Sequence, residues 1–264
     1  MQTKLTVSVD NIPQEPLHGE WGLSILAAHR GSSILIDAGA SGLFAENMRA
    51  LGLSIRDVDC AMLSHAHYDH ANGMVRFFQE NATAKFYLRE SAQENCYARY
   101  LIFRKYIGLP RHVLTDYKDR IVHVSGDYLL SDGAYLIGHK TPGLSQIGKR
   151  ERMYQKTARG LVPDDFSHER GLLIVNCCSH GGVVNIIREV RETFPGKHVY
   201  GYIGGFHLFN KSDAEIRAVA QNIRATGLEF VCTGHCTGQR AYDILKQTLG
   251  NRLHQLHVGL GMTF

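Results

Sequence analysis

The chain has 264 residues, 44% of them hydrophobic and 20% charged, and 29 basic against 25 acidic side chains give a net charge of +4. This composition is ordinary for a globular protein and excludes a disordered chain, and the length suits a single α/β domain with a large core. The mild positive charge does not indicate a polyanionic partner, so we expect no nucleic-acid partner.

The amino terminus, residues 1–7, alternates like a strand and lacks the apolar core of a secretory signal. No window approaches the roughly 18 apolar residues of a membrane span. We therefore expect a cytoplasmic protein without membrane contact. The six cysteines are expected to be reduced thiols, because Cys177 and Cys178 are adjacent and nothing indicates export. Both a monomer and a homo-oligomer remain open.

Hydrophobic periodicity predicts two similar halves in which strands alternate with helices. The first half is predicted to have strands at 4–9, 23–28, 33–37, 58–63, 85–88, 121–124 and 134–138, and helices at 41–51, 71–80 and 91–107. The second half is predicted to have strands at 171–176, 198–203 and 230–232, and helices at 183–193, 214–225 and 242–249. This order favours two sheets packed face to face and covered by helices, which is an α/β (α+β) four-layer αββα sandwich. We predict one domain, residues 1–264, with insertions near 91–114 and 144–166.

Residues 64–70, Ser-His-Ala-His-Tyr-Asp-His, follow the buried strand predicted at 58–63. In an extended loop His65 and His67 project from the same side, so both can hold one ion at the roughly 2.0 to 2.1 Å typical of zinc and imidazole nitrogen. Asp69 and His70 fall where the next helix begins and face elsewhere. They are therefore expected to bind a second ion, since paired metals in hydrolytic sites lie roughly 3.5 to 4 Å apart.

The H-x-H-x-D-H motif after a strand resembles the signature of the metallo-β-lactamase superfamily. Three further segments resemble its other motifs: I-D-A-G at 36–39, C-S-H-G at 178–181 and T-G-H-C-T-G at 233–238. Together with G-G-F-H-L at 204–208, they are similar to the branch that includes the dihydropterin-type synthase acting on a ribofuranosylaminobenzene phosphate, and many metal-dependent hydrolases. The resemblance implies the αββα fold, with metals at one edge where loops of both halves meet.

Three more histidines, His180, His207 and His235, each follow a predicted strand of the second half. The resemblance implies one ion held by His65, His67 and His180, and another held by Asp69, His70 and His235, with His207 near them. We expect one or two divalent ions, zinc first, with manganese, iron or magnesium as alternatives. Asp37 is expected to accept the free N–H of a ligating histidine. The alternative is that Asp37 only starts a turn.

The sequence also departs from the superfamily pattern. Many members carry T-P-G-H and a bridging Asp, whereas this chain has T-P-G-L at 141–144 and C-S-H at 178–180. One ion is therefore expected to be weakly held or absent. His139 either ends a strand and points to solvent or stands in for the missing ligand. Cys178 and Cys236 lie beside proposed ligands, so a thiolate ligand is an alternative to two buried hydrophobic thiols. Cys232 and Cys236 are an alternative zinc or redox pair.

Two insertions are candidates for substrate recognition. Residues 145–160 carry five basic side chains, among them Arg150 and Arg152, against one acid. They form either a solvated face or a loop that binds a phosphate through arginine forks. The aromatic residues within 91–114 form either core packing or a lid over a flat ring.

A divalent ion lowers the pKa of bound water toward 7, and Asp69 is expected to orient the resulting hydroxide and accept its proton. His207, with Arg150 and Arg152, is expected to contact a phosphate. We therefore predict a metal-dependent hydrolase or transferase of a small phosphorylated or ester-like substrate, including a dihydropterin-type synthase. The alternatives are a noncatalytic metal-dependent binding or sensory protein and a nuclease, which the mild charge disfavours.

Overall fold

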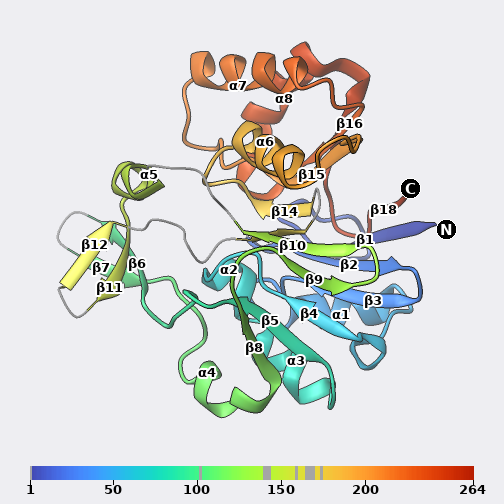
Figure 1. Ribbon diagram of the computed structural model, residues 1–264, viewed down its shortest axis with the longest axis vertical. Coiled ribbons are helices and arrows are strands. Elements are labelled where there is room, and N and C mark those ends of the chain that lie inside the picture. The colour runs from blue at the N-terminus through green and yellow to red at the C-terminus, as the bar shows by residue number, and fades with distance from the viewer. Residues whose placement is uncertain (1, 101–102, 139–143, 158–159, 164–169, 173–174) are drawn as a thin grey trace.

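Two seven-stranded sheets face each other and are covered by helices on their outer sides (Figure 1). The structure is a computed structural model that describes residues 2–100, 103–138, 144–157, 160–163, 170–172 and 175–264. The predicted four-layer αββα sandwich is confirmed. Residues 139–143, and with them His139 and most of the T-P-G-L segment, lie outside the described residues.

The first sheet has the strand order β18-β1-β2-β3-β4-β5-β8. Its strands are β1 (Thr3–Val9), β2 (Ser24–His29), β3 (Ser32–Ile36), β4 (Cys60–Met62), β5 (Lys85–Arg89), β8 (Ile121–Val124) and β18 (Gly261–Thr263). Helices α1 (Leu43–Ala50) and α3 (Met74–Glu80) cover its outer face, and α4 (Val113–Asp116) lies at the same side (Figure 1). The fully buried rings of Phe44, Phe77 and Phe86 form part of the core between these helices and the sheet.

The second sheet has the order β17-β16-β15-β14-β13-β10-β9. Its strands are β9 (Tyr128–Ser131), β10 (Ala134–Gly138), β13 (Arg170–Leu172), β14 (Val175–Cys178), β15 (Gly201–Gly205), β16 (Phe230–Thr233) and β17 (Leu253–Gln255). Helices α6 (Val183–Thr193), α7 (Asp213–Ala225) and α8 (Gln239–Leu249) cover its outer face (Figure 1). Ser212 and Glu215 form a capping box that fixes the start of α7.

A second apolar cluster, which includes Tyr202, Ile216 and Leu245, lies between the second sheet and its helices, and a third fills the space between the two sheets. It combines side chains of the first sheet, such as Ile25 and Ile34, with Val175 and Ile203 of the second. Each sheet therefore buries both of its faces, which explains why its strands are almost continuously apolar. No helix among the described residues is long and apolar enough to cross a membrane.

The predicted helix at 91–107 is wrong. This segment forms strands β6 (Cys96–Tyr100) and β7 (Phe103–Tyr106), which join β11 (Met153–Thr157) and β12 (Gly160–Pro163) in a small separate sheet (Figure 1). Aromatic residues favour strands, and Tyr97 and Tyr106 face each other across the β6–β7 pair with ring centroids 5.3 Å apart. Helical spacing of aromatic residues was therefore a misleading signal.

The predicted basic loop at 145–160 is also wrong in its local structure, because it forms helix α5 (Leu144–Glu151) followed by β11 and the start of β12. The predicted helix at 71–80 is two helices, α2 (Tyr68–Ala71) and α3, which are separated at Asn72 and Gly73. The predicted strand at 171–176 is the pair β13 and β14. The remaining elements are the short turns η1 (Ile55–Asp57), η2 (Lys118–Arg120), η3 (His235–Thr237) and η4 (Gly250–Arg252).

Candidate metal centre

The segments that carry the predicted ligands end strands at one edge of the sandwich. In the first sheet β3 and β4 are parallel, and Asp37 and the 64–70 segment follow them. In the second sheet β14, β15 and β16 are parallel, and His180, His207 and His235 follow them in turn. Because the carboxyl ends of parallel strands meet at one edge, the topology brings these distant segments together.

Asp69, His70 and His235 form one group of donor atoms. The Nε2 atoms of His70 and His235 lie 3.1 Å apart, and Asp69 Oδ2 lies 3.8 Å from the first and 3.7 Å from the second. Donors that share one tetrahedral ion at about 2.0 to 2.1 Å are roughly 3.3 Å from each other. This triangle of donor atoms therefore has the size of one face of a metal's coordination shell.

His65, His67 and Asp69 form a second group, with donor atoms all within 4.8 Å of one another. The rings of His65 and His67 pack edge to face with centroids 4.6 Å apart, as expected for neighbours that point to one side. The His180 ring lies beside both, at 5.2 and 5.4 Å. Asp69 belongs to both groups, so a bridging carboxylate is available although the superfamily's usual position for it holds Cys178-Ser179-His180.

Asp37 lies beneath these histidines and contacts two parts of the metal loop. Its Oδ2 accepts a hydrogen bond from His70 Nδ1 at 2.7 Å, and both of its oxygens accept bonds from Ser64, from the backbone N at 2.6 Å and from Oγ at 2.5 Å. Ser64 Oγ is also 3.0 Å from His65 Nδ1. Because His70 Nδ1 is held by Asp37, the ring is oriented so that its Nε2 atom points toward the donor atoms of Asp69 and His235.

Asp10 and Asn11, which follow β1, hold His235 in place, and sequence reasoning missed them. Asp10 Oδ2 accepts the His235 backbone N–H at 2.9 Å, and Asn11 contacts His235 Nδ1 through Oδ1 at 3.1 Å and its carbonyl through Nδ2 at 3.0 Å. His235 has φ +46, a left-handed conformation that these bonds stabilise. The only available signal was a polar Asp-Asn pair at a strand end.

The charges in the site support each other. Burial alone would raise the pKa of Asp69, but His70, His235 and His67 lower it below its usual value. Burial opposes protonation of His70, yet Asp69 and Asp37 raise its pKa. Burial lowers the pKa of His235. Asp69 is therefore ionised at neutral pH and His235 favours the neutral imidazole, as metal binding requires, whereas a metal at His70 must displace the proton that Asp69 and Asp37 favour.

His207, Cys178 and Cys236 form a further group beside the histidines. The Sγ atoms of Cys178 and Cys236 are 3.0 Å apart, and His207 Nδ1 is 3.4 Å from Cys178 Sγ. Burial raises the pKa of the Cys236 thiol, but the bond from Cys178 and the imidazoles of His235 and His207 bring it well below its usual value. Cys232 is not part of this group, and its pKa is raised to about 12 by burial.

A cavity of about 330 Å³ opens above these groups. Five of the predicted metal ligands, four histidines and Asp69, line this cavity. The aromatic side chains of Trp21, Tyr68 and Phe209 also line it, as do Ala98, Ile107 and Met153 of the small sheet and its flank. The aromatic residues Tyr97 and Tyr106 of the predicted lid pack on each other and do not line it. The insertions therefore contribute apolar wall residues.

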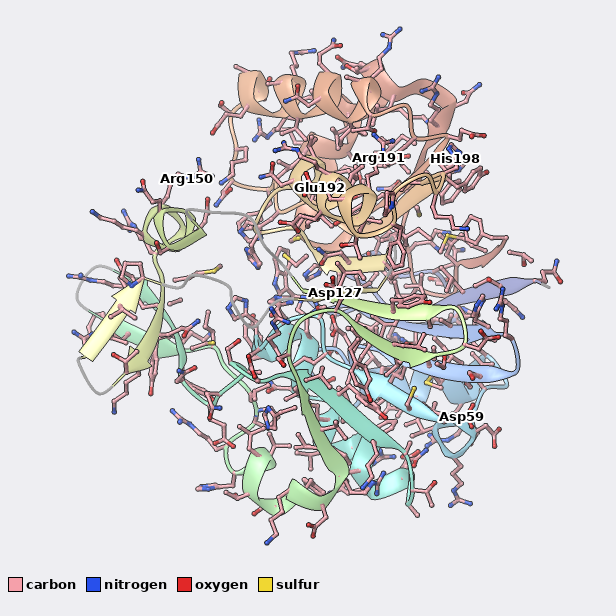
Figure 2. The ribbon with its side chains drawn as sticks, in the orientation of Figure 1. Asp59, Asp127, Arg150, Arg191, Glu192 and His198 are labelled. Atoms are coloured by element: carbon pink, nitrogen blue, oxygen red, sulfur yellow. The ribbon has the colours of Figure 1, made fainter. Side chains whose placement is uncertain are left out.

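The structure does not bring Arg150 and Arg152 to this cavity. Both side chains are exposed, neither lines the cavity, and Figure 2 shows Arg150 at the outer side of α5. Instead Glu151 faces inward with 4% of its side chain exposed, bound to Lys211 and to Asn210 Nδ2 at 2.5 Å. Its Oε2 lies 3.9 Å from His207 Nε2. The last turn of α5 is thus anchored to the segment that follows His207.

The donor set fits divalent metals, because several imidazole nitrogens and one carboxylate converge. The Nδ1 atoms of His70 and His235, which face away from the donor groups, are held by Asp37 and Asn11. Residues 22–151 match the family model described as the Metallo-beta-lactamase superfamily. The chain therefore has the metallo-β-lactamase fold, and the resemblance predicted from its motifs is confirmed.

Particular relatives are similar over nearly the whole chain. The 7,8-dihydropterin-6-methyl-4-(beta-D-ribofuranosyl)-aminobenzene-5'-phosphate synthase of Methanocaldococcus jannaschii is 25% identical over 88% of this chain and 89% of its own. An uncharacterised protein of the same organism is 28% identical over 97% and 98%. The crystal structure of Tm1679, a metal-dependent hydrolase of the β-lactamase superfamily, superimposes with a TM-score of 0.82 at 27% identity, covering 98% of each chain.

Proposed function

We propose that the protein is a metal-dependent enzyme that hydrolyses or transfers a phosphate-type or ester-type group of a small molecule. The observation that carries this proposal is the position of Asp69, whose carboxylate belongs both to the group with His65 and His67 and to the group with His70 and His235. Superfamily likeness and a distant synthase relative support an enzyme rather than a binding protein.

The residues that would hold the metals are His65, His67, Asp69 and His180 on one side, and Asp69, His70 and His235 on the other. Such ions supply Lewis acidity, which polarises a phosphoryl or carbonyl oxygen and lowers the pKa of water. Asp37 and Asn11 keep the rings of His70 and His235 oriented. This leaves the donor atoms in place before the substrate arrives.

Two side chains are positioned to move protons. Asp69 is 13% exposed at the cavity and ionised, so its carboxylate can accept a proton from an attacking nucleophile. His207 Nε2 is buried without a hydrogen-bond partner among the described residues, beside Glu151. We assign it the role of donating a proton to a leaving oxygen or binding an anionic group, in place of the outward Arg150 and Arg152.

The cavity favours a small substrate with an apolar or flat part. Its volume of about 330 Å³ admits a small molecule, and the Trp21 and Phe209 rings, 5.7 Å apart, form an aromatic wall beside His235 and His207. A net charge of +4 does not provide the continuous basic surface of a nuclease. A synthase that joins an aromatic ring to a pterin, as the Methanocaldococcus relative is named, is the second candidate for the same site.

The experiment is metal-dependent turnover of the purified protein, loaded in turn with zinc, manganese, iron or magnesium. Phosphomonoesters, phosphodiesters, thioesters and lactones serve as substrates, and His65→Ala and His235→Ala as variants. His198→Ala is the matched control, since His198 is exposed and paired with Glu229, and Figure 2 shows it on the opposite side of the molecule from Arg150. Turnover that both ligand variants lose and the control keeps supports the proposal, and bound metal without any turnover supports the noncatalytic alternative.

A further inference from the structure

A sulfur-rich group lies beside the His/Asp centre. Cys178 ends β14, His207 follows β15, and Cys236 lies in η3 after β16, so three neighbouring strands of the second sheet each supply one member. The donor atoms of all three lie within 4.8 Å of one another, and all three side chains are buried. The proposed function does not use the two thiols.

The backbone brings these sulfurs together. The His207 N–H donates to Cys236 Sγ at 3.2 Å, and the Leu208 and Phe209 N–H groups donate to the Cys236 carbonyl at 3.0 and 3.2 Å. A Cβ atom at Gly205 would lie 2.5 Å from Cys236 Sγ, so only glycine permits the sulfur to approach β15 this closely. Cys236 is therefore fixed from several sides.

The spacing of the donors suits a soft metal ion. Two thiolates bound to one tetrahedral zinc at about 2.3 Å are roughly 3.8 Å apart. The Cys178 and Cys236 sulfurs are 3.0 Å apart, so binding requires them to separate by less than 1 Å. His207 Nδ1, at 3.4 Å from Cys178 Sγ, supplies a nitrogen on the same side and leaves Nε2 for its role in the cavity. Two sulfurs and one imidazole select zinc or Cu(I) over magnesium or manganese.

We propose that Cys178, Cys236 and His207 hold a thiolate-bound metal ion in addition to the ions of the His/Asp centre. Cys178 also lies within 4.8 Å of donors of His65 and His180, so it connects the two sites, whereas Cys236 belongs to the sulfur group alone. Substitution of Cys236 therefore separates this site from the His/Asp centre.

The test loads the reduced, metal-free protein with Co²⁺, whose thiolate complexes show a sulfur-to-cobalt charge-transfer absorption that histidine and carboxylate complexes lack. We expect this absorption in the wild-type protein, and its loss in Cys178→Ser and in Cys236→Ser. Cys60→Ser is the matched control, because Cys60 is buried in the core between the sheets. We expect the cobalt-loaded Cys60→Ser variant to keep the absorption. The readout requires no turnover, so it is independent of whether the proposed reaction is correct.

Elemental analysis after zinc loading provides the second measurement. We expect Cys236→Ser to bind one ion fewer than the wild-type protein and than Cys60→Ser. The proposal would be overturned if the wild-type protein takes up cobalt without showing the charge-transfer absorption. This outcome depends on the wild-type protein alone, so it remains decisive even if every variant misfolds. The proposal would also be overturned if Cys178 and Cys236 form a disulfide on oxidation but bind no zinc after the disulfide is reduced.

Discussion

Asp37 and His70 are joined by a 2.7 Å hydrogen bond between Oδ2 and Nδ1, and both side chains are fully shielded from solvent. Asp37 has φ +56, a left-handed conformation that directs its carboxylate under the metal loop. The bond ties the end of β3 to the start of α2, so the orientation of a ligand ring depends on a residue that touches no substrate.

Asp37→Asn is expected to weaken metal binding by about 10- to 100-fold, in the range found for lost outer contacts of metal ligands. Asparagine tolerates the left-handed conformation, but its amide nitrogen cannot accept a bond from Ser64 or His70. Competition with a zinc chelator measures the affinity. Asp59→Asn is the control, because Asp59 is exposed and accepts a hydrogen bond from the Ser33 N–H. An unchanged affinity in Asp37→Asn would remove Asp37 from the site.

Asp10 gives the metal-free protein a characteristic pH dependence. Burial raises its pKa to about 7, above the roughly 3.9 of an unfolded aspartate, although bonds from Ile12 and His235 oppose the shift. The folded state therefore binds more protons between these values. Its contribution to stability is present below about pH 4 and is lost as the pH rises through 7.

The free energy of unfolding of the metal-free wild-type protein is accordingly expected to fall more steeply between pH 4 and 7 than that of Asp10→Asn. Urea denaturation at a series of pH values measures both curves, and other titrating groups cancel in the comparison. Parallel curves would show that Asp10 does not titrate in this range.

Gly73 lies where the metal loop passes the end of β3. A Cβ atom there would lie 2.0 Å from the Ala38 carbonyl oxygen and 2.7 Å from that of Ser41, so Gly73→Ala must displace α3 or the Asp37 turn. We expect a loss of about 3 kcal/mol or more in unfolding free energy, at the upper end for overpacking, together with weaker metal binding.

Gly261→Ala is the matched control, because a Cβ atom at Gly261 meets nothing within 4 Å. We expect its unfolding free energy to change by about 0.5 kcal/mol or less. Equal effects of the two substitutions in thermal or urea denaturation would contradict the close packing of Gly73 against Ala38.

The sequence was most informative where ligands are close along the chain. The spacing of His65, His67, Asp69 and His70 predicted two groups of donors, and the structure has them with Asp69 in both. The gathering of His180 and His235 at the same edge followed from strand ends and a family resemblance. These predictions depend on local spacing and on sheet topology, which a single sequence encodes strongly.

Contacts between distant segments could not be predicted in this way. Asn11 and His235 are 224 positions apart, and no periodicity links them. The small sheet was missed because β6 pairs with β11, more than 50 positions away, and pairing partners outside the local window decide between helix and strand. Glu151 rather than Arg150 turns inward because Lys211 and Asn210 bind it.

The shared position of Asp69 between two ions can be tested in a crystal structure of metal-loaded protein, with anomalous scattering to locate the ions. We expect two ions on either side of Asp69, roughly 3.5 to 4 Å apart, one contacting His65 and His67 and the other contacting His70 and His235. Ions absent from this edge, or bound there without contact to Asp69, would contradict it.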